Sequence, residues 1–111
     1  NITSITLGSL NAYIQKVYPD DYVLHQNFPN PFNPTTHITY ELPKTSLVKI
    51  TIYDLLGNKV KQLVNDRQTS GNKSIIWNAK NENNEKVSAG VYIYSIETSG
   101  FKSSKKMLLL K

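Results

Sequence analysis

The sequence has 111 residues, 39% of them hydrophobic, with 13 basic and 8 acidic side chains and a formal net charge of +5. This length predicts one domain around a single core, and the composition is that of a globular rather than a disordered chain. The absence of cysteine excludes disulfides, thiol catalysis and cysteine-bound metals, and no apolar run is long enough for a membrane-spanning helix.

The first 21 residues differ from the rest of the chain. The sequence begins with Asn1 rather than methionine and has no signal-peptide pattern, so we expect a fragment of a longer protein. Short apolar patterns occur in residues 2–17, but Pro19, Asp20 and Asp21 then break the chain. We therefore expect residues 1–21 to be a linker or the tail of a preceding domain, and residues 22–111 to form the folded domain.

From Tyr22 onward, β-prone segments alternate with turn signals. Ile38, Tyr40 and Leu42 alternate with polar residues, as in a strand with one buried face. Gly57 and Gly100 are expected to have positive φ in turns, and residues 65–72 and 78–90 read as polar loops. The expected strands cover residues 22–24, 37–42, 48–53, 59–64, 74–77, 91–96 and 101–110. Seven short strands predict an all-β antiparallel β-sandwich, with Trp77 at the centre of its core.

A proline-rich segment lies between the first two expected strands. Its three prolines within residues 29–34 exclude helix and central strand. We expect a rigid loop across one end of the sandwich, with Phe28 and Phe32 inserted into the core. A ligand for an aromatic groove is the alternative, which the interleaved asparagines disfavour.

No motif in the sequence predicts catalysis or metal binding. His25 and His37 are the only histidines and lack zinc-ligand spacing, and no G-x-S-x-G motif occurs. The acidic residues are scattered rather than paired as glycoside hydrolysis requires. The loop 78–85 is rich in side-chain oxygens but does not match a calcium-binding loop. We expect no enzyme activity, no metal and no cofactor.

Two binding interpretations remain for the surface. Exposed aromatics on a sandwich can stack on sugars, and Tyr53 is the best candidate for such a residue in a carbohydrate-binding or adhesive module. Lys102, Lys105, Lys106 and Lys111 make the end of the chain basic, which suits phosphate or an anionic membrane surface. A strand face with lysines guarding a sheet edge explains them more simply, and aromatic and basic residues do not alternate as in nucleic-acid binding.

Several motifs, taken in order, resemble one family. Residues 27–36, NFPNPFNPTT, resemble the N-Y-P-N-P-F-N-P-x-T signature of type A C-terminal sorting domains of the bacterial type IX secretion system. Residues 38–43 and 48–57 resemble its I-x-Y-x-L-P and V-x-L-x-I-Y-D-x-x-G motifs, and residues 60–64 its V-x-x-L-V. Trp77 matches the single tryptophan, and the segments 87–92 and 105–111 resemble V-x-S-G-V-Y and the closing R/T-K-K-M-x-L-L-K.

The resemblance covers residues 22–111 and is shared with hook-capping-protein-like C-terminal Ig modules. Asn78-Ala79 and Asn84 depart from it, because the family often has Asp-Gly and Gly at these places. It implies an Ig-like sandwich that sorts a larger N-terminal cargo of a Bacteroidota bacterium. The cargo is expected to pass through the periplasm and the outer-membrane translocon to the cell surface or the exterior. There a sortase commonly cuts the linker and joins the cargo to an anionic lipopolysaccharide. We also expect no nucleic-acid partner, no direct membrane insertion and a monomer.

The resemblance also implies roles for individual residues. If the last strand lies at a sheet edge, its free backbone groups are expected to pair with a receptor strand, steered by the lysines. The residues expected to contact the translocon are Gly90, Tyr92, Lys105, Lys106, Met107, Leu108, Leu109, Leu110 and Lys111. The residues expected to maintain the fold are Asn27, Pro29, Asn30, Pro31, Phe32, Asn33, Pro34, Gly57 and Trp77.

Overall fold

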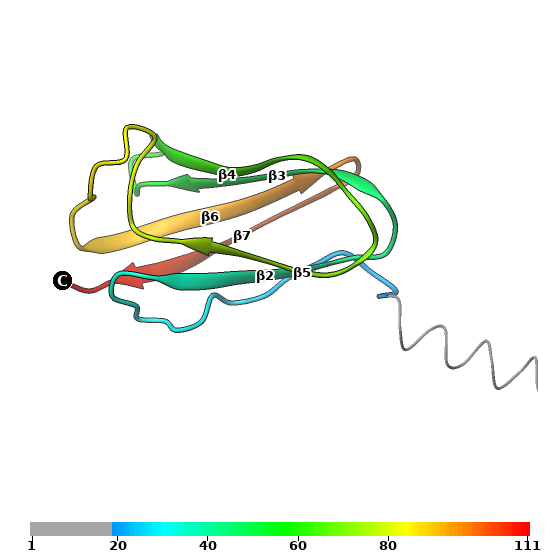
Figure 1. Ribbon diagram of the computed structural model, residues 1–111, viewed down its shortest axis with the longest axis horizontal. Coiled ribbons are helices and arrows are strands. Elements are labelled where there is room, and N and C mark those ends of the chain that lie inside the picture. The colour runs from blue at the N-terminus through cyan, green and yellow to red at the C-terminus, as the bar shows by residue number, and fades with distance from the viewer. Residues whose placement is uncertain (1–18) are drawn as a thin grey trace, which may run out of the picture.

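The computed structural model describes residues 19–111, so the expectation of a linker concerns residues that lie almost entirely outside the described part. Seven strands form two sheets packed face to face (Figure 1). They are β1 (Val23–Leu24), β2 (Thr36–Leu42), β3 (Ser46–Tyr53), β4 (Lys59–Gln68), β5 (Gly71–Trp77), β6 (Gly90–Thr98) and β7 (Phe101–Leu109). No helix in this part of the chain has the length and hydropathy needed to cross a membrane.

The two sheets are antiparallel, and their strand orders are β1-β2-β5 and β4-β3-β6-β7. The predicted all-β sandwich of seven short strands is therefore confirmed. Strand β7, red in Figure 1, is the last strand of the four-stranded sheet, and β6 is its one neighbour within that sheet. This edge position decides which of its backbone groups remain available to other parts of the molecule.

The core lies between the sheets and follows the period-two patterns of the sequence. Ile38, Tyr40 and Leu42 of β2 are at most 1% exposed, and Trp77 at the end of β5 is completely buried. The Trp77 ring meets Tyr92 edge-on at 5.4 Å and Phe32 at 5.9 Å between ring centroids. Aromatic contacts of this geometry stabilise a core beyond the area they bury, so the predicted central role of Trp77 is confirmed.

Phe28 is an exception to the predicted core. Its side chain is 77% exposed, whereas Phe32 is 2% exposed as expected. Two backbone hydrogen bonds join Phe28 to His37, from the Phe28 N–H (2.9 Å) and back to the Phe28 carbonyl (2.8 Å). This bridge extends the three-stranded sheet by one residue. Because Asn27 before it is buried and side chains alternate along extended backbone, Phe28 points to solvent.

Residues 65–72, expected as a polar loop, belong mostly to two strands. Strand β4 continues to Gln68, and β5 begins at Gly71. Asn65, Asp66 and Arg67 pair with β3 although their side chains are exposed. Strand β4 has no partner strand on its other side within residues 19–111, and an edge strand of this kind can be polar on both faces. Hydrophobic periodicity therefore missed it.

The two glycines expected in turns have the predicted conformation. Gly57 follows β3 with φ of 89°, and Gly100 joins β6 to β7 with φ of 91°. A Cβ atom is strained at these φ values. The positive φ of both residues explains why glycine suits these turns.

Candidate functional site

The outer edge of β7 is divided into a covered half and an open half. In the antiparallel pair of β6 and β7, backbone groups of alternate residues point toward and away from the neighbouring strand. The bonds formed by Lys106, Leu108 and Leu110 with other segments identify the even-numbered residues as those that point outward. Lys102 and Ser104 share this orientation. Their outward N–H and C=O groups have no protein partner within residues 19–111.

The proline-rich loop covers the half of this edge toward the end of the chain. The Phe32 N–H donates to the Leu108 carbonyl (3.0 Å), and the Leu110 N–H donates to the Phe32 carbonyl (2.8 Å), which makes a parallel bridge. The Asn30 Oδ1 accepts the Leu108 N–H (2.9 Å), and the Gln26 side-chain amide donates to the Lys106 carbonyl (2.8 Å). The loop motif therefore fixes the final residues of β7 in place and leaves the part near Gly100 open.

Asn27 fixes the loop itself. It is 2% exposed, and its side-chain amide donates to the Thr36 hydroxyl (2.9 Å) and the Pro29 carbonyl (3.2 Å). Its backbone N–H donates to the Tyr94 hydroxyl (2.8 Å), which in turn donates to the His25 carbonyl (2.6 Å). Buried polar groups need such partners, so these bonds give Asn27 a structural role. The peptide bonds before Pro29, Pro31 and Pro34 are cis, and Asn33 is exposed at the end of the loop.

The buried hydroxyl of Tyr94 predicts a loss of stability at alkaline pH. Burial raises the pKa of Tyr94 to about 12, although the hydrogen bond from Asn27 lowers it in part, and burial also raises the pKa of Tyr40. An unfolded tyrosine ionises near pH 10. Because its folded-state pKa is raised, Tyr94 makes its full contribution to the free energy of unfolding below about pH 10. This contribution falls as pH rises toward 12, by at most about 1.4 kcal/mol per pH unit.

Urea unfolding of the wild type and of Tyr94→Phe between pH 8 and pH 11.5 measures this effect. At pH 8 the variant is expected to be less stable by about 1–3 kcal/mol, because the Asn27 N–H and the His25 carbonyl lose their buried partner. Above pH 10 the gap should narrow. Lysine titration is common to both proteins and cancels in the difference. A gap that stays constant across this range would contradict the assignment.

The residues expected at the translocon contact fall into three groups. Tyr92, Met107 and Leu109 are between 1% and 6% exposed and belong to the core. Lys105 and Leu108 are half-buried, whereas Lys106, Leu110 and Lys111 are exposed. Gly90 begins β6 with φ of 147°, a conformation that a side chain would strain. The structure thus places these residues on β6, on β7 and in the two residues that follow β7, but exposes only some of their side chains.

Lys102 and Ser104 were not among those expected residues, although both side chains are exposed. They share the outer face of the sheet with Lys106, since all three are even-numbered residues of one strand. The cross-strand register places Lys106 beside Ile93 and Ile93 beside Tyr53. Composition pointed to the lysines of the last ten residues, Lys102 among them, and the family resemblance pointed to residues 105–111. The edge position of residues 102–104 became visible only with the strand order.

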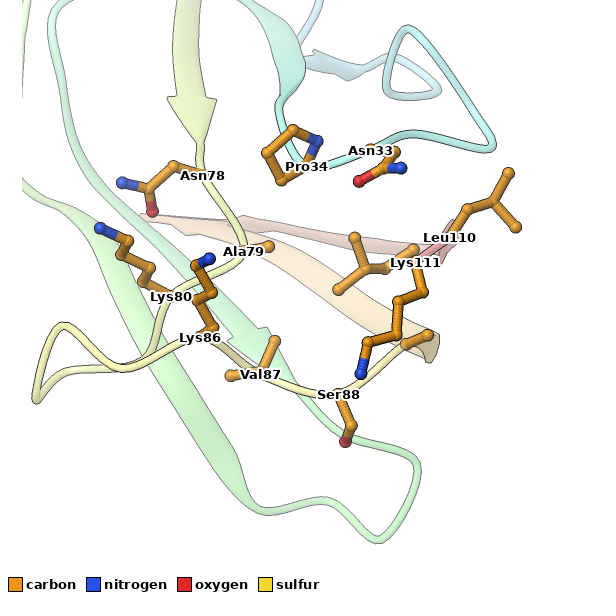
Figure 2. Close-up of a pocket in the computed structure, with 12 residues that line it drawn as sticks. Asn33, Pro34, Asn78, Ala79, Lys80, Lys86, Val87, Ser88, Leu110 and Lys111 are labelled. Atoms are coloured by element: carbon orange, nitrogen blue, oxygen red, sulfur yellow. The ribbon is translucent and has the colours of Figure 1, made fainter.

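A pocket of about 690 Å³ lies where the covered end of β7 meets the loops at one end of the sandwich (Figure 2). We call it the end pocket. Pro34, Ala79, Val87 and Leu109 supply apolar surface, and three lysines supply positive charge. Its lining residues are Asn33, Pro34, Asn78, Ala79, Lys80, Lys86, Val87, Ser88, Ala89, Leu109, Leu110 and Lys111. No local sequence pattern predicts this pocket, because its walls come from four separate segments.

The other candidate sites offer less chemistry. His25 and Glu41 pair through their side chains on the outer surface. The residues of the described chain contain no group of three or more His, Asp or Glu side chains that could hold a metal ion. Tyr53, the residue expected to stack on sugars, is half-buried, and Tyr22 stacks on Phe101 at 5.3 Å. Phe28 is the large aromatic side chain that residues 19–111 leave most exposed.

A family model described as the secretion system C-terminal sorting domain matches residues 26–110. The curated protein sequences contain no match. The matched range includes both the proline-rich loop and β7, the two elements that form the divided edge. The family match therefore covers the divided edge and strands β2 to β7.

Solved structures with a similar fold include three proteins. Dimeric latent PorU from Porphyromonas gingivalis is 22% identical over 81% of this chain, with a TM-score of 0.61. PorZ, a surface component of the type-IX secretion system of the same organism, is 19% identical over 83% (TM-score 0.55). FlgD from P. aeruginosa is 24% identical over 67% (TM-score 0.54). The matches span 9% of PorU, 12% of PorZ and 57% of FlgD, so the similarity concerns one part of each protein.

Proposed function

This chain belongs to the family of secretion system C-terminal sorting domains and directs a secreted protein through type IX secretion. From this premise we propose that β7 is the element that the translocon recognises. The rest of the secreted protein lies on the N-terminal side of the domain. The domain itself acts as a signal and performs no catalysis. Its role is to present a fixed surface on a folded support.

The observation that carries this proposal is the open half of the β7 edge. Lys102 and Ser104 direct backbone N–H and C=O groups outward without a protein partner in residues 19–111. A receptor strand can pair with such groups, which supply affinity through main-chain hydrogen bonds. The exposed ammonium groups of Lys102 and Lys106 flank this stretch, and they favour a receptor that carries acidic residues.

The covered half of the edge makes this surface more precise. Gln26, Asn30 and Phe32 occupy the outward groups from Lys106 onward. A receptor strand therefore pairs along residues 102–104 and stops where the loop begins to cover the edge. The loop also prevents unspecific pairing along the rest of β7, which is a common hazard of exposed strands.

The same geometry supports a path for the carrier protein. Strand β1 begins at Val23, so a cut by a sortase before Asp21 leaves all seven strands intact. We place this cut in residues 1–21. The carrier protein crosses the periplasm and the outer membrane while it is still attached to the domain, and the cut then releases it at the cell surface or outside the cell.

The proposal is tested with a passenger protein that carries an export signal at its N-terminus and residues 1–111 at its C-terminus. In a bacterium with type IX secretion, the wild-type fusion is expected at the surface or in the medium. Lys102→Glu/Lys106→Glu is expected to lower the sorted fraction at least about tenfold, because like charges then face the receptor. Cell fractionation and surface labelling measure the sorted fraction.

Two comparisons separate recognition from edge protection and folding. Lys44→Glu/Lys59→Glu changes the net charge equally at exposed sites away from β7 and should sort normally. A glutamate at a strand edge prevents unwanted strand pairing as well as a lysine does. If Lys102 and Lys106 only protected the edge, Lys102→Glu/Lys106→Glu would therefore sort normally. Ser104→Pro removes one outward N–H, which a proline at a strand edge allows, and should also reduce sorting. Normal sorting of both β7 variants would reject the proposal.

A further inference from the structure

The end pocket carries positive charge that the described chain does not neutralise. Lys80 and Lys86 face each other across an isolated antiparallel bridge, an arrangement in which like charges repel. The acidic residues of the same loop have other partners. Glu82 lies 3.6 Å from the Lys61 ammonium, and the Glu85 carboxylate accepts a hydrogen bond from Asn81 (3.3 Å). Within residues 19–111, neither Lys80 nor Lys86 has an ion pair.

The shape and polarity of the pocket suit a side chain attached to a peptide. A volume of about 690 Å³ lies within the usual range of ligand sites, about 300–1,000 Å³. Pro34, Ala79, Val87 and Leu109 form apolar surface between the lysines, and none of the lining residues is acidic. Figure 2 shows Lys80 and Lys86 side by side, with Leu110 and Lys111 across the pocket from them.

Hydrogen bonds hold three of the four segments of the pocket wall in place. The Trp77 indole donates to the Lys80 carbonyl (2.9 Å), and the Val87 N–H donates to the Ala79 carbonyl (3.0 Å). The Tyr92 hydroxyl donates to the Ser88 carbonyl (2.6 Å), and Leu110 is bonded to Phe32 (2.8 Å). A site formed before binding loses less conformational entropy when it is occupied.

The wall also contains a strained residue. Ala79 has φ of 62° and is 4% exposed, and a residue with a Cβ atom adopts this left-handed conformation at a free-energy cost. Strained backbone is concentrated at binding sites. Here it positions the carbonyl that accepts the Val87 N–H, and thereby the spacing between the two strands of the bridge that carry Lys80 and Lys86.

We propose that the end pocket binds an acidic peptide segment of a protein partner, with one aliphatic side chain on the apolar floor and flanking carboxylates on Lys80, Lys86 and Lys111. The apolar floor favours a peptide over a phosphate or an acidic polysaccharide, which would leave it uncovered. The inference rests on the proposed sorting function only in naming the partner as a component of the secretion machinery. The pocket and its ligand chemistry stand apart from the β7 edge.

The test uses the whole chain and three capped pentapeptides: Asp-Glu-Leu-Asp-Glu, its amide analogue Asn-Gln-Leu-Asn-Gln, and Asp-Glu-Gly-Asp-Glu. Trp77 is the only tryptophan and lies next to the pocket wall, so its fluorescence reports binding, and calorimetry gives the affinity. The first peptide is expected to bind at least about tenfold more tightly than either of the others. Its affinity should fall as salt concentration rises.

Lys80→Gln/Lys86→Gln provides the decisive variant. It should bind the first peptide at least about tenfold more weakly and raise the melting temperature by about 2–4 °C, because it removes the repulsion across the bridge. Lys44→Gln/Lys59→Gln is the control and should bind as the wild type does. Equal binding of all three peptides, tighter binding of polygalacturonate or inorganic phosphate, or an unchanged affinity of the pocket variant would each overturn the inference.

Sorting of the passenger fusion keeps the two proposals distinct. If the wild-type fusion is sorted but the pocket variant retains its affinity for the first peptide, only the end-pocket inference fails. If the wild-type fusion is not sorted although the peptide binds as expected, the sorting role of this chain fails and the pocket remains an acidic-peptide site.

Discussion

Deletion of residues 105–111 is expected to abolish sorting of a passenger and to unfold the domain at the same time. The deleted segment contains Met107 and Leu109, which are 1% and 4% exposed, and it forms half of the pairing between β6 and β7. Loss of two buried side chains of this size destabilises a domain by about 4–10 kcal/mol, against a typical total stability of about 5–15 kcal/mol. Circular dichroism should find no cooperative thermal transition, and fractionation should find the passenger retained or degraded.

A shorter deletion separates folding from recognition. Leu110 and Lys111 are exposed, and their removal takes away one backbone hydrogen bond, from the Leu110 N–H to the Phe32 carbonyl. The domain should lose about 1 kcal/mol and remain folded, so a sorting defect in this variant reports on contact with the machinery. A cooperative transition in the protein that lacks residues 105–111 would contradict the structural account of β7.

Elements with one clearly buried face were predictable from sequence. Ile38, Tyr40 and Leu42 alternate strictly with polar residues, and β-branched and aromatic residues dominate residues 91–96. These patterns depend on which neighbouring side chains share a face, and that relation is local in the sequence. Phe28 was wrongly placed in the core because the proline-rich loop has no regular period, so the direction of each side chain depends on long-range hydrogen bonds.

The division of the β7 edge could not be derived from local patterns. It depends on two long-range hydrogen bonds. Asn30 bonds to Leu108, 78 positions later in the chain, and Gln26 bonds to Lys106, 80 positions later. The end pocket is similar, because Lys80 and Lys86 come from the two sides of one loop, whereas Pro34, Leu109 and Lys111 come from segments distant from it in the sequence. The resemblance to the family indicated that residues 27–34 and 105–111 are important. The strand order supplied the reason, since both segments meet at one edge.

The departures from the family pattern have a physical meaning in the structure. Ala79 and Asn84, which stand where the family often has glycine, are the two residues other than glycine with positive φ in residues 19–111. Asparagine tolerates this conformation, whereas alanine is strained in it. The loop therefore keeps the turn geometry typical of glycine although the glycines are absent.

The largest effect of a single substitution on stability is expected for Trp77→Ala. The Trp77 side chain is completely buried between Phe32 and Tyr92, and its indole N–H donates to the Lys80 carbonyl at 2.9 Å. Replacement by alanine leaves a cavity between the sheets, which costs about 3–5 kcal/mol. Loss of the hydrogen bond also frees the loop that carries Lys80. Urea unfolding followed by circular dichroism measures the difference without relying on tryptophan fluorescence.

Two neighbouring variants make this prediction specific. Trp77→Phe keeps most of the packing but loses the hydrogen bond, and it should cost less than the alanine variant, about 1–3 kcal/mol. Ile76→Ala alters the preceding residue of β5, whose side chain is 52% exposed on the outer face, and should change stability by about 0.5 kcal/mol or less. Because β5 alternates between core and solvent, adjacent positions should differ severalfold in effect. A cost below about 1 kcal/mol for Trp77→Ala, or equal costs at residues 76 and 77, would mean that the two sheets do not pack around this indole.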